Sequence, residues 1–548
     1  MRKFTFLVIA IALIGYSNIL NAQVPILEKT YDVSGKAKRG LLGGVEINKE
    51  KGTFDMYYMI PSIFGSAENV SSFNKDIPCE VYTYDKELNL VSNSKVDVRP
   101  RSFDWAVYKG LYSYEIVRFM INIGGISFQK VDRQYGYDPK TGKYSINRET
   151  ILDKEKPRTA DGNKYTSGYS YDVAAERSSM VFAGKKIEKT EETKKNLLHL
   201  FHHYMHYDVL YCDKDLNVSV TDSIDFEYMT MPWYSGQITD DRIETNDELA
   251  RDWVMIFIAD YHPKGLPFRA PNPTYYTYIR INPQGKIVDK FNFDSPANLW
   301  KIGGVYEKNN SVYIYGSAIN QDRENKNREN FYGSKGFDDF THYQFGKISN
   351  GKFDFLTCTS LKDIQAKQLK PVGQKNAIEL DGKYAVTTEI KVLNTGDIYI
   401  SYQKYDMKEK EYKDLSLFQF DASGNIKKSY GLDIKSNISI KWGDAYDMPA
   451  NNYFYTSGDN KSLYWFIRST KAVSGSIGSN MLGINYCSIN IETGELSELK
   501  TFGNDKKNPF YVFNITKPVQ LDNNIYFFSE DKGKGGSNMR LTRVDISK

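Results

Sequence analysis

The chain has 548 residues, of which 41% are hydrophobic, and a formal net charge of +4; this length allows several domains or one large repetitive domain. Its 72 Lys and Arg and 68 Asp and Glu residues are scattered together along the sequence, as on an ordinary solvated surface. A nucleic-acid partner would require a strong basic excess on one face. The composition therefore predicts no nucleic-acid partner.

The first 22 residues predict a secretory signal peptide. Arg2 and Lys3 precede a short apolar core, and the small residue Ala22 precedes the expected cleavage point; the segment is too short for a membrane span. The residue after that point is Gln23 rather than Cys, and no later apolar stretch reaches spanning length. We therefore expect an exported soluble protein, periplasmic or extracellular, without a lipid anchor or a membrane span.

Two strand-turn-strand phrases recur along the rest of the chain, and both are rich in the 42 Tyr residues and in β-branched residues, as is typical of all-β proteins. The first phrase occurs at 43–60, 303–317, 384–402, 453–469 and 518–530. The second, with a tight polar turn, occurs at 81–98, 135–146, 209–226, 276–293, 343–356, 417–434 and 486–502. We interpret Asp85, Asp138, Asp213 and Asp421 in these turns as turn formers.

Together the two phrases make a unit of four antiparallel strands, repeated about eight times with a period of about 65 residues. Small sheets repeating at this spacing predict an all-β fold, a β-propeller of about eight four-stranded blades. Because 99–150 is poorly patterned, a seven-bladed propeller is the alternative, and a tandem of β-sandwiches is a further one. Residues 23–548 are expected to form a single propeller domain.

The histidines gather in the segment NLLHLFHHYMHYDVL, at His199, His202, His203 and His206. On a helical wheel these four lie opposite an apolar arc, so we expect a short helix inserted near 190–206 that runs into a strand near Tyr207. Histidines four positions apart can converge on a transition metal. The alternative is a polar helix face exposed to water, and no cofactor is expected apart from this possible metal.

The long irregular segments mostly join the second and third strands of a unit, whereas the turns between the third and fourth strands are short. This asymmetry predicts ligand binding on the face with the long loops. Candidate ligand-binding residues there are Trp233, Tyr234, Tyr275, Tyr276, Phe331, Tyr332, Phe337, Asp338, Asp339 and His342. The tryptophans between units have two interpretations: packing between blades with the indole N–H bonded to a backbone carbonyl, or aromatic platforms for sugar rings.

The two ends of the chain complement one another. Residues 539–548 have the pattern of a third strand without a fourth, and 24–35 precede the first complete unit. We expect 24–35 to supply the missing strand of the last blade (511–548), which would leave no free sheet edge between the first and last blades.

The four cysteines, Cys79, Cys212, Cys358 and Cys487, are more than a hundred residues apart along the chain. Export permits disulfides, but clustered spacing is missing, and three of the four belong to apolar strand-like runs. They are therefore predicted to be buried small apolar residues rather than a disulfide framework.

The layout resembles the exported, Tyr- and Lys-rich propeller proteins of the Bacteroidota. The resemblance is carried by YCDKDLNVSVTDSIDFEYMTMPW (211–233) and by its lysine-rich lead-in KKIEKTEETKKN (185–196). It implies a fold and an exported location, and brings no catalytic residues with it.

Three functions are consistent with these features. The leading hypothesis is a monomeric, non-catalytic propeller that binds a glycan or a protein on the face with the long loops. The alternatives are a hydrolase or lyase acting on polysaccharide at the central channel, and a structural protein of the envelope. The sequence contains no phosphate-binding loop and no GxSxG elbow, but a glycosidase's two carboxylates have no local signature.

Overall fold

A computed structural model describes residues 26–547 except 40, 61–76, 99–111, 123–124, 139–142, 166, 174–177, 186–203, 242–250, 260–274, 298, 320–339, 381–384, 407–410, 435–449, 475–478, 503–517 and 532–537. The predicted signal peptide therefore lies outside the described residues. So do Phe331, Tyr332, Phe337, Asp338, Asp339 and three of the four clustered histidines.

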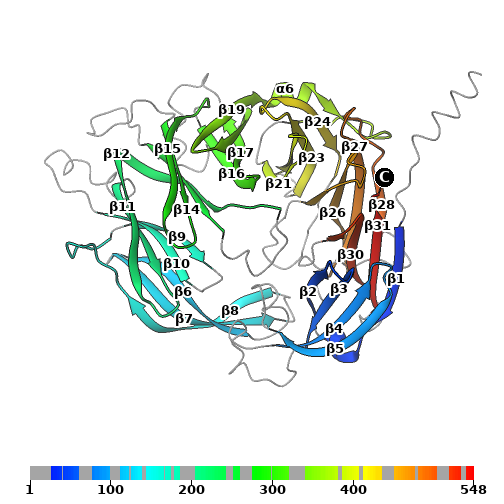
Figure 1. The fold of residues 1–548 in the computed structure, drawn as a ribbon, viewed down its shortest axis with the longest axis horizontal. Coiled ribbons are helices and arrows are strands. Elements are labelled where there is room, and N and C mark those ends of the chain that lie inside the picture. Colours follow the sequence, from blue (N-terminus) through cyan, green and yellow to red (C-terminus); the bar gives the residue numbers. More distant parts are fainter. Residues whose placement is uncertain are drawn as a thin grey trace, which may run out of the picture.

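The sheets stand side by side in a ring around a central axis (Figure 1). The first two blades contain β2 (Leu41–Asn48), β3 (Thr53–Met59), β4 (Ile77–Asp85) and β5 (Leu90–Val98), and then β6 (Tyr112–Asn122), β7 (Gly125–Asp138) and β8 (Lys143–Glu155). The next two share one strand: β9 (Ser167–Val173), β10 (Ser178–Gly184), β11 (Tyr204–Cys212), the shared β12 (Val218–Gln237), β13 (Trp253–Ala259), β14 (Tyr275–Ile281) and β15 (Ile287–Asp294).

The second half of the ring is more regular. Blade 5 contains β16 (Leu299–Lys308), β17 (Ser311–Ile319), β18 (His342–Ser349) and β19 (Lys352–Ser360), and blade 6 contains β21 (Val386–Val392), β22 (Ile398–Asp406), β23 (Glu411–Phe420) and β24 (Ile426–Leu432). Blade 7 contains β25 (Asn451–Thr456), β26 (Ser462–Ser474), β27 (Ser479–Asn490) and β28 (Lys500–Phe502). Blade 8 contains β29 (Val519–Leu521), β30 (Asn524–Asp531), β31 (Asn538–Asp545) and β1 (Ile26–Asp32).

The β-propeller prediction is confirmed, with eight blades: six separate sheets, plus one seven-stranded sheet that β12 divides into two blades. The first strand of a blade lies nearest the axis and the fourth lies at the rim, as β2 and β5 show in Figure 1. Strand β12 belongs to two blades because its first half pairs with β11 and its second half with β13.

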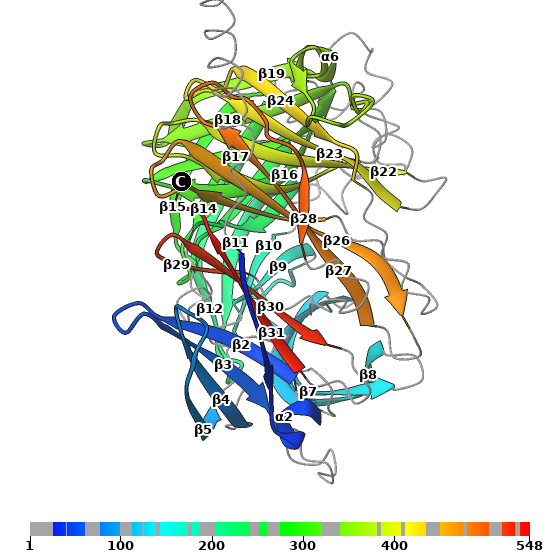
Figure 2. The ribbon, with the colours of Figure 1, turned by 90° about the vertical axis from the view of Figure 1, so that its right-hand side faces the viewer.

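The ends of the chain meet in blade 8. Strand β1 pairs antiparallel with β31 along its whole length, from Ile26 opposite Val544 to Asp32 opposite Asn538. Figure 2 shows the two strands side by side. The rim strand of the last blade therefore comes from the beginning of the described chain.

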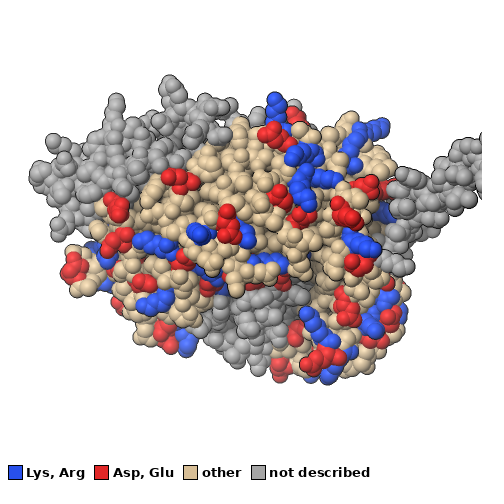
Figure 3. Space-filling model, turned by 45° about the horizontal axis from the view of Figure 1, so that its top comes forward, with Lys and Arg blue, Asp and Glu red and all other residues tan. Residues whose placement is uncertain are grey.

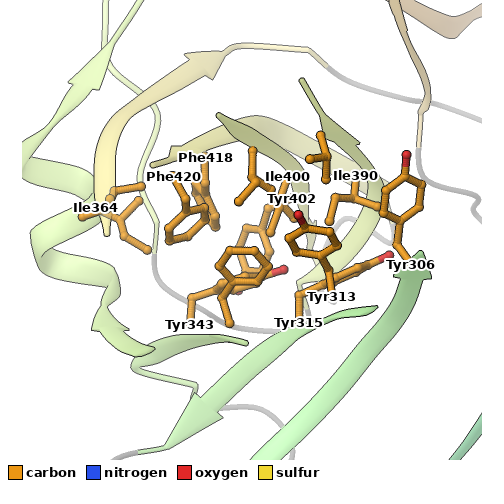
Figure 4. Packing of buried hydrophobic residues seen from close by; sticks show 14 of the residues in the cluster. Tyr306, Tyr313, Tyr315, Tyr343, Ile364, Ile390, Ile400, Tyr402, Phe418 and Phe420 are labelled. Atoms are coloured by element: carbon orange, nitrogen blue, oxygen red, sulfur yellow. The ribbon is translucent and has the colours of Figure 1, made fainter. Parts of the chain in front are cut away.

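The core lies between neighbouring blades, because a single sheet cannot bury both of its faces alone. Figure 4 shows the cluster between blades 5 and 6, where tyrosine and phenylalanine rings from β18 meet isoleucines and aromatic rings from β21, β22 and β23. The ring centroid of Tyr343 lies 5.3 Å from that of Phe418 and 5.8 Å from that of Tyr402. Such edge-to-face pairs each add about 0.5–1.5 kcal/mol beyond area burial.

Two short helices occur among the described residues, α2 (Gly35–Arg39) and α6 (Leu361–Ala366). Ser360 caps α6 by accepting a hydrogen bond from the backbone N–H of Asp363, and Leu361 and Ile364 are buried. After α6, β20 (Gln368–Leu369) pairs in parallel with the rim strand β24. Together they cover the outer edge of blade 6, which limits pairing with another chain.

The structure corrects the end of the helix expected near 190–206. Strand β11 begins at Tyr204, so His206 is in a strand and lies opposite Asp225 of β12. Strand β11 pairs with β10 and β12. Tyr207 and Val209 pack in the core on one side of this sheet, and Leu210 and Cys212 pack in the core on the other side, as side chains of a strand do. Residues 190–203 lie outside the described residues.

Candidate ligand-binding site

The first strands of blades 5 to 8 end close to the axis at one face of the ring, the axial mouth. These are β16, β21, β25 and β29, each followed by the turn that leads to its second strand. A pocket of about 440 Å³ opens there, lined by Asp241, Lys391, Phe454, Tyr455, Thr456, Ser457, Gly458, Asn460, Pro518, Gln520 and Asn523. The pocket therefore lies on the face of the short turns, opposite the face where the sequence predicted a ligand.

The tail of β12 brings Asp241 to this mouth. After β12 ends, the backbone N–H of Thr239 donates to the carbonyl of Val305 at 3.0 Å, and the N–H of Glu307 donates to the carbonyl of Thr239 at 2.7 Å. These bonds hold the tail of blade 4 in parallel with β16 of blade 5. Asp241 follows Thr239 by two residues and lies beside the end of β16, where Lys308 contacts it.

Three side chains from two blades surround the Asp241 carboxylate. The Tyr306 hydroxyl donates a hydrogen bond of 2.6 Å to this carboxylate. The ammonium groups of Lys308 and Lys391 lie 2.9 and 3.3 Å from its oxygens. Burial raises the pKa of Asp241, but the positive charge of Lys391 and the hydrogen bonds from Tyr306 and Lys308 outweigh it and hold the pKa below the usual range. Asp241 is therefore a carboxylate at neutral pH.

The opposite wall comes from blades 7 and 8 and is mostly uncharged. The Tyr455 hydroxyl donates to the carbonyl of Pro518 at 3.1 Å, which joins β25 to the segment before β29. The N–H of Gly458 donates to the carbonyl of Ile546 at 3.0 Å, which fixes the turn after β25 against the end of the chain. Asn460, Gln520 and Asn523 add amide groups to the lining.

The described lining provides hydrogen-bond donors and acceptors. A glycosidase needs a pair of carboxyl groups, and general acid–base catalysis works best with a group whose pKa is near the working pH. Among the described lining residues, one is a carboxylate, Asp241, whose pKa is lowered, and its neighbour Tyr306 has a raised pKa because of burial and the hydrogen bond to Asp241. Neither group is poised to exchange a proton at neutral pH.

The candidate aromatic residues at the start of blade 4 are packed. The indole N–H of Trp233 donates to the backbone carbonyl of Trp300 at 2.6 Å, and Trp233 packs against the core between blades 4 and 5. This agrees with the interpretation of the tryptophans as packing residues between blades. Tyr234 packs against the same core, and burial raises its pKa to about 12.

The remaining described candidates do not join the pocket. Tyr276 is fully buried, and its ring stacks on Phe293 at 5.4 Å. Tyr275 and His342 are half-buried at the first positions of β14 and β18, and His342 Nδ1 lies 2.8 Å from the Thr341 hydroxyl. The other five candidates lie outside the described residues, and their predicted role stays a prediction.

Of the four clustered histidines, only His206 lies within the described residues. His206 Nδ1 lies 2.6 Å from the Asp225 carboxylate, on the exposed surface of blade 3. In the described part of the chain, no group of three or more His, Cys, Asp or Glu side chains could hold a metal ion. All four cysteines are free, and three of them are buried. Burial raises the pKa of the Cys79 and Cys212 thiols to about 12.

Sequence reasoning missed the pocket residues. Asp241, Asn460 and Asn523 read as ordinary turn residues, and Lys391 reads as one of many surface lysines. Four blades, spread over nearly 300 positions from 241 to 523, supply the lining. The sequence could have indicated these residues only through their place in the repeat. In a propeller, the turns that follow the first strands of the blades surround the axis.

No protein-family model and no curated protein matches the chain. Among solved structures, the WD40 domain of SCAP from fission yeast is 7% identical with a TM-score of 0.26, over 96% of this chain and 98% of that one. Polysaccharide lyase Uly1 is 10% identical with a TM-score of 0.30, over 92% and 90%. The lignostilbene dioxygenase of Pseudomonas brassicacearum is 10% identical with a TM-score of 0.30, over 96% and 94%.

At these identities and scores, the likenesses give no information on activity. The class of this protein, an eight-bladed β-propeller, depends on its own sheet topology. Among the described helices, none is long and apolar enough to cross a membrane.

Proposed function

We propose that this chain is a binding propeller that holds a glycan, without transforming it, in the axial pocket on the face of the short turns. The observation that carries the proposal is the composition of the lining, where amide and hydroxyl side chains from blades 7 and 8 face a carboxylate and an ammonium group. Sugar hydroxyls both donate and accept hydrogen bonds, and an amide offers both functions.

The size of the pocket supports the same proposal. Its volume of about 440 Å³ falls within the range of about 300–1,000 Å³ typical of small-molecule sites. Phe454 and Tyr455 also line the pocket, but their rings pack in the cores on the two sides of β25. The lining therefore offers mainly polar groups, which suits the hydroxyls of a sugar.

Surface charge favours a small or extended polar ligand over a nucleic acid. In Figure 3 the blue and red residues are interspersed over the described surface in view, without a large area of one sign. A nucleic-acid-binding face would instead concentrate Lys and Arg.

The test is binding to an array of oligosaccharides, by the wild-type protein and by Gln520→Trp, whose indole would fill the pocket from β29. We expect at least one oligosaccharide to bind, and Gln520→Trp to bind it at least about tenfold more weakly, since a filled pocket loses most of its contacts. Val372→Trp is the matched control, because Val372 is 67% exposed and does not line the pocket.

Three outcomes would contradict the proposal. Absence of binding to any glycan would favour a protein ligand or a structural role. Glycan binding that survives Gln520→Trp would favour the face with the long loops. Release of shortened oligosaccharides over time would favour a hydrolase or lyase.

A further inference from the structure

The three partners of Asp241 hold it unequally. Lys308 donates both to Asp241 at 2.9 Å and to the backbone carbonyl of Val392 at 2.6 Å, and its side chain is 16% exposed. Lys391 lies 3.3 Å from Asp241, the longest of the three contacts, and its side chain is 24% exposed. If Lys391 turned away, Asp241 would therefore still accept hydrogen bonds from the ammonium group of Lys308 and from the hydroxyl of Tyr306.

Lys391 is also one of the residues that line the pocket, whereas Lys308, the other ammonium partner of Asp241, is not. The other charged residue on the same side of β21 is Glu389, two positions earlier. At about 3.3 Å per residue, Glu389 is roughly 7 Å further from the mouth, and it is absent from the lining. Of the two charged side chains in the described lining, Asp241 and Lys391, Lys391 is the one that can change partners, because Asp241 is also held by Lys308 and Tyr306.

We propose that the ligand is an acidic glycan, and that Lys391 leaves Asp241 to bind its carboxylate or sulfate group. This inference depends on the proposed function and specifies its ligand class. The acidic group would lie at the wall formed by blades 4 and 6, with the sugar hydroxyls against the amides of Asn460, Gln520 and Asn523. Asp241, still bound by Lys308 and Tyr306, would then keep its charge compensated.

The experiment uses matched pairs of oligosaccharides that differ in charge alone. One pair is a uronic-acid oligosaccharide and its methyl ester, and the other is a sulfated oligosaccharide and its desulfated form. We expect the acidic member of at least one pair to bind at least about tenfold more tightly than the neutral member, because a charge-assisted hydrogen bond is among the stronger polar contacts. The pair that shows the difference identifies the acidic group as a carboxylate or a sulfate.

Two variants of Lys391 test the residue. Lys391→Met keeps the apolar stem, and Lys391→Gln keeps a hydrogen-bond donor without the charge. Both are expected to reduce the ratio of acidic to neutral affinity at least about tenfold. Lys347→Met is the matched control, since Lys347 forms an ion pair with Asp354 at 3.0 Å and is similarly exposed, but does not line the pocket. It should keep the wild-type ratio.

The wild-type protein provides a test that does not depend on the folding of any variant. Raising the ionic strength should weaken binding of the acidic member more than that of the neutral member, because salt screens the charge of Lys391. Equal affinity for both members of each pair, or an unchanged ratio in both Lys391 variants, would overturn this inference and leave the proposed function standing. Absence of binding to any member would overturn this inference alone, because the oligosaccharide array tests the proposed function separately.

Discussion

At the scale of single residues, one aspartate holds the tight turn between the third and fourth strands in blades 1, 3 and 6. In blade 3, Asp213 Oδ1 accepts from the N–H groups of Asp215 and Asn217 at 2.8 and 2.9 Å, and Oδ2 accepts from the Asn217 amide at 2.8 Å. Asp85 and Asp421 make the same three bonds with their own turns. The interpretation of these three aspartates as turn formers is confirmed.

The bonds also affect the acidity of Asp213. Partial burial raises its pKa, but the hydrogen bonds from Asn217 and Asp215 and the charge of Lys214 outweigh it and lower the pKa. A carboxyl group with a lower pKa in the folded than in the unfolded chain stabilises the fold at neutral pH. That contribution is lost as the pH falls through the folded-state pKa, which lies below the ordinary value for an aspartate.

We therefore expect Asp213→Ala to lower the free energy of unfolding by about 1 kcal/mol at pH 7. Asp215→Ala is the control, because it removes the same charge without the turn bonds, and should change stability by less than about 0.5 kcal/mol. Urea unfolding from pH 7 down to pH 3 measures both. The deficit of Asp213→Ala should shrink below about pH 4; an equal deficit in both variants at pH 7 would contradict the role assigned to Asp213.

At the scale of elements, the first strand of several blades contains a bulge at a comparable position. The register shifts fall between Leu42 and Gly44, Pro232 and Tyr234, Ile302 and Gly304, and Thr387 and Glu389. A bulge bends a strand and redirects the side chains that follow it. The bulge in β21 ends two residues before Lys391, and so helps to set its direction toward the pocket.

The bulge in β16 requires a glycine in the neighbouring strand. A Cβ atom added to Gly316 would lie 1.9 Å from the backbone oxygen of Lys301 and 2.7 Å from the backbone nitrogen of Gly303. We expect Gly316→Ala to cost about 1–3 kcal/mol, since the two strands must move apart.

The control for this prediction is Gly35→Ala in α2, where an added Cβ meets no atom within 4 Å. It should leave stability unchanged or raise it by up to about 1 kcal/mol. Thermal unfolding of the two variants and the wild type decides the comparison. Equal melting temperatures for all three would mean that β16 and β17 accommodate the methyl group.

At the scale of the whole molecule, the rim strand of several blades contacts the third-to-fourth turn of the next blade. The Thr221 hydroxyl donates to Gly285 O at 2.8 Å and the Thr357 hydroxyl donates to Gly424 O at 2.9 Å, over 64 and 67 positions. These separations match the repeat of about 65 residues predicted from the sequence. At the closure, the Tyr31 hydroxyl of β1 donates to the carbonyl of Leu88 in the same turn of blade 1.

Strand β1 therefore contacts blade 1 as the other rim strands contact their neighbours, so its removal should open the ring. A chain lacking residues 26–32 loses the packing of Leu27 and Tyr31 against the core between blades 8 and 1. We expect a loss of at least about 3 kcal/mol, and self-association through the uncovered edge of β31.

Thermal unfolding and analytical ultracentrifugation measure these two effects. The control is Thr30→Ala, an exposed residue of β1, which should change stability by less than about 0.5 kcal/mol. A truncated chain with the wild-type melting temperature and mass would show that the ring stays closed without β1.

The repeat, the four-stranded unit and the turn aspartates could be read from the sequence, because each depends on local periodicity and on turn chemistry within a few residues. The helix boundary near His206 could not, because pairing with β12 overrides the local apolar arc. The pocket depended entirely on tertiary structure. Asp241 meets Lys391 only because the closed ring brings the inner ends of separate blades to one axis, and no local pattern encodes a contact across 150 positions.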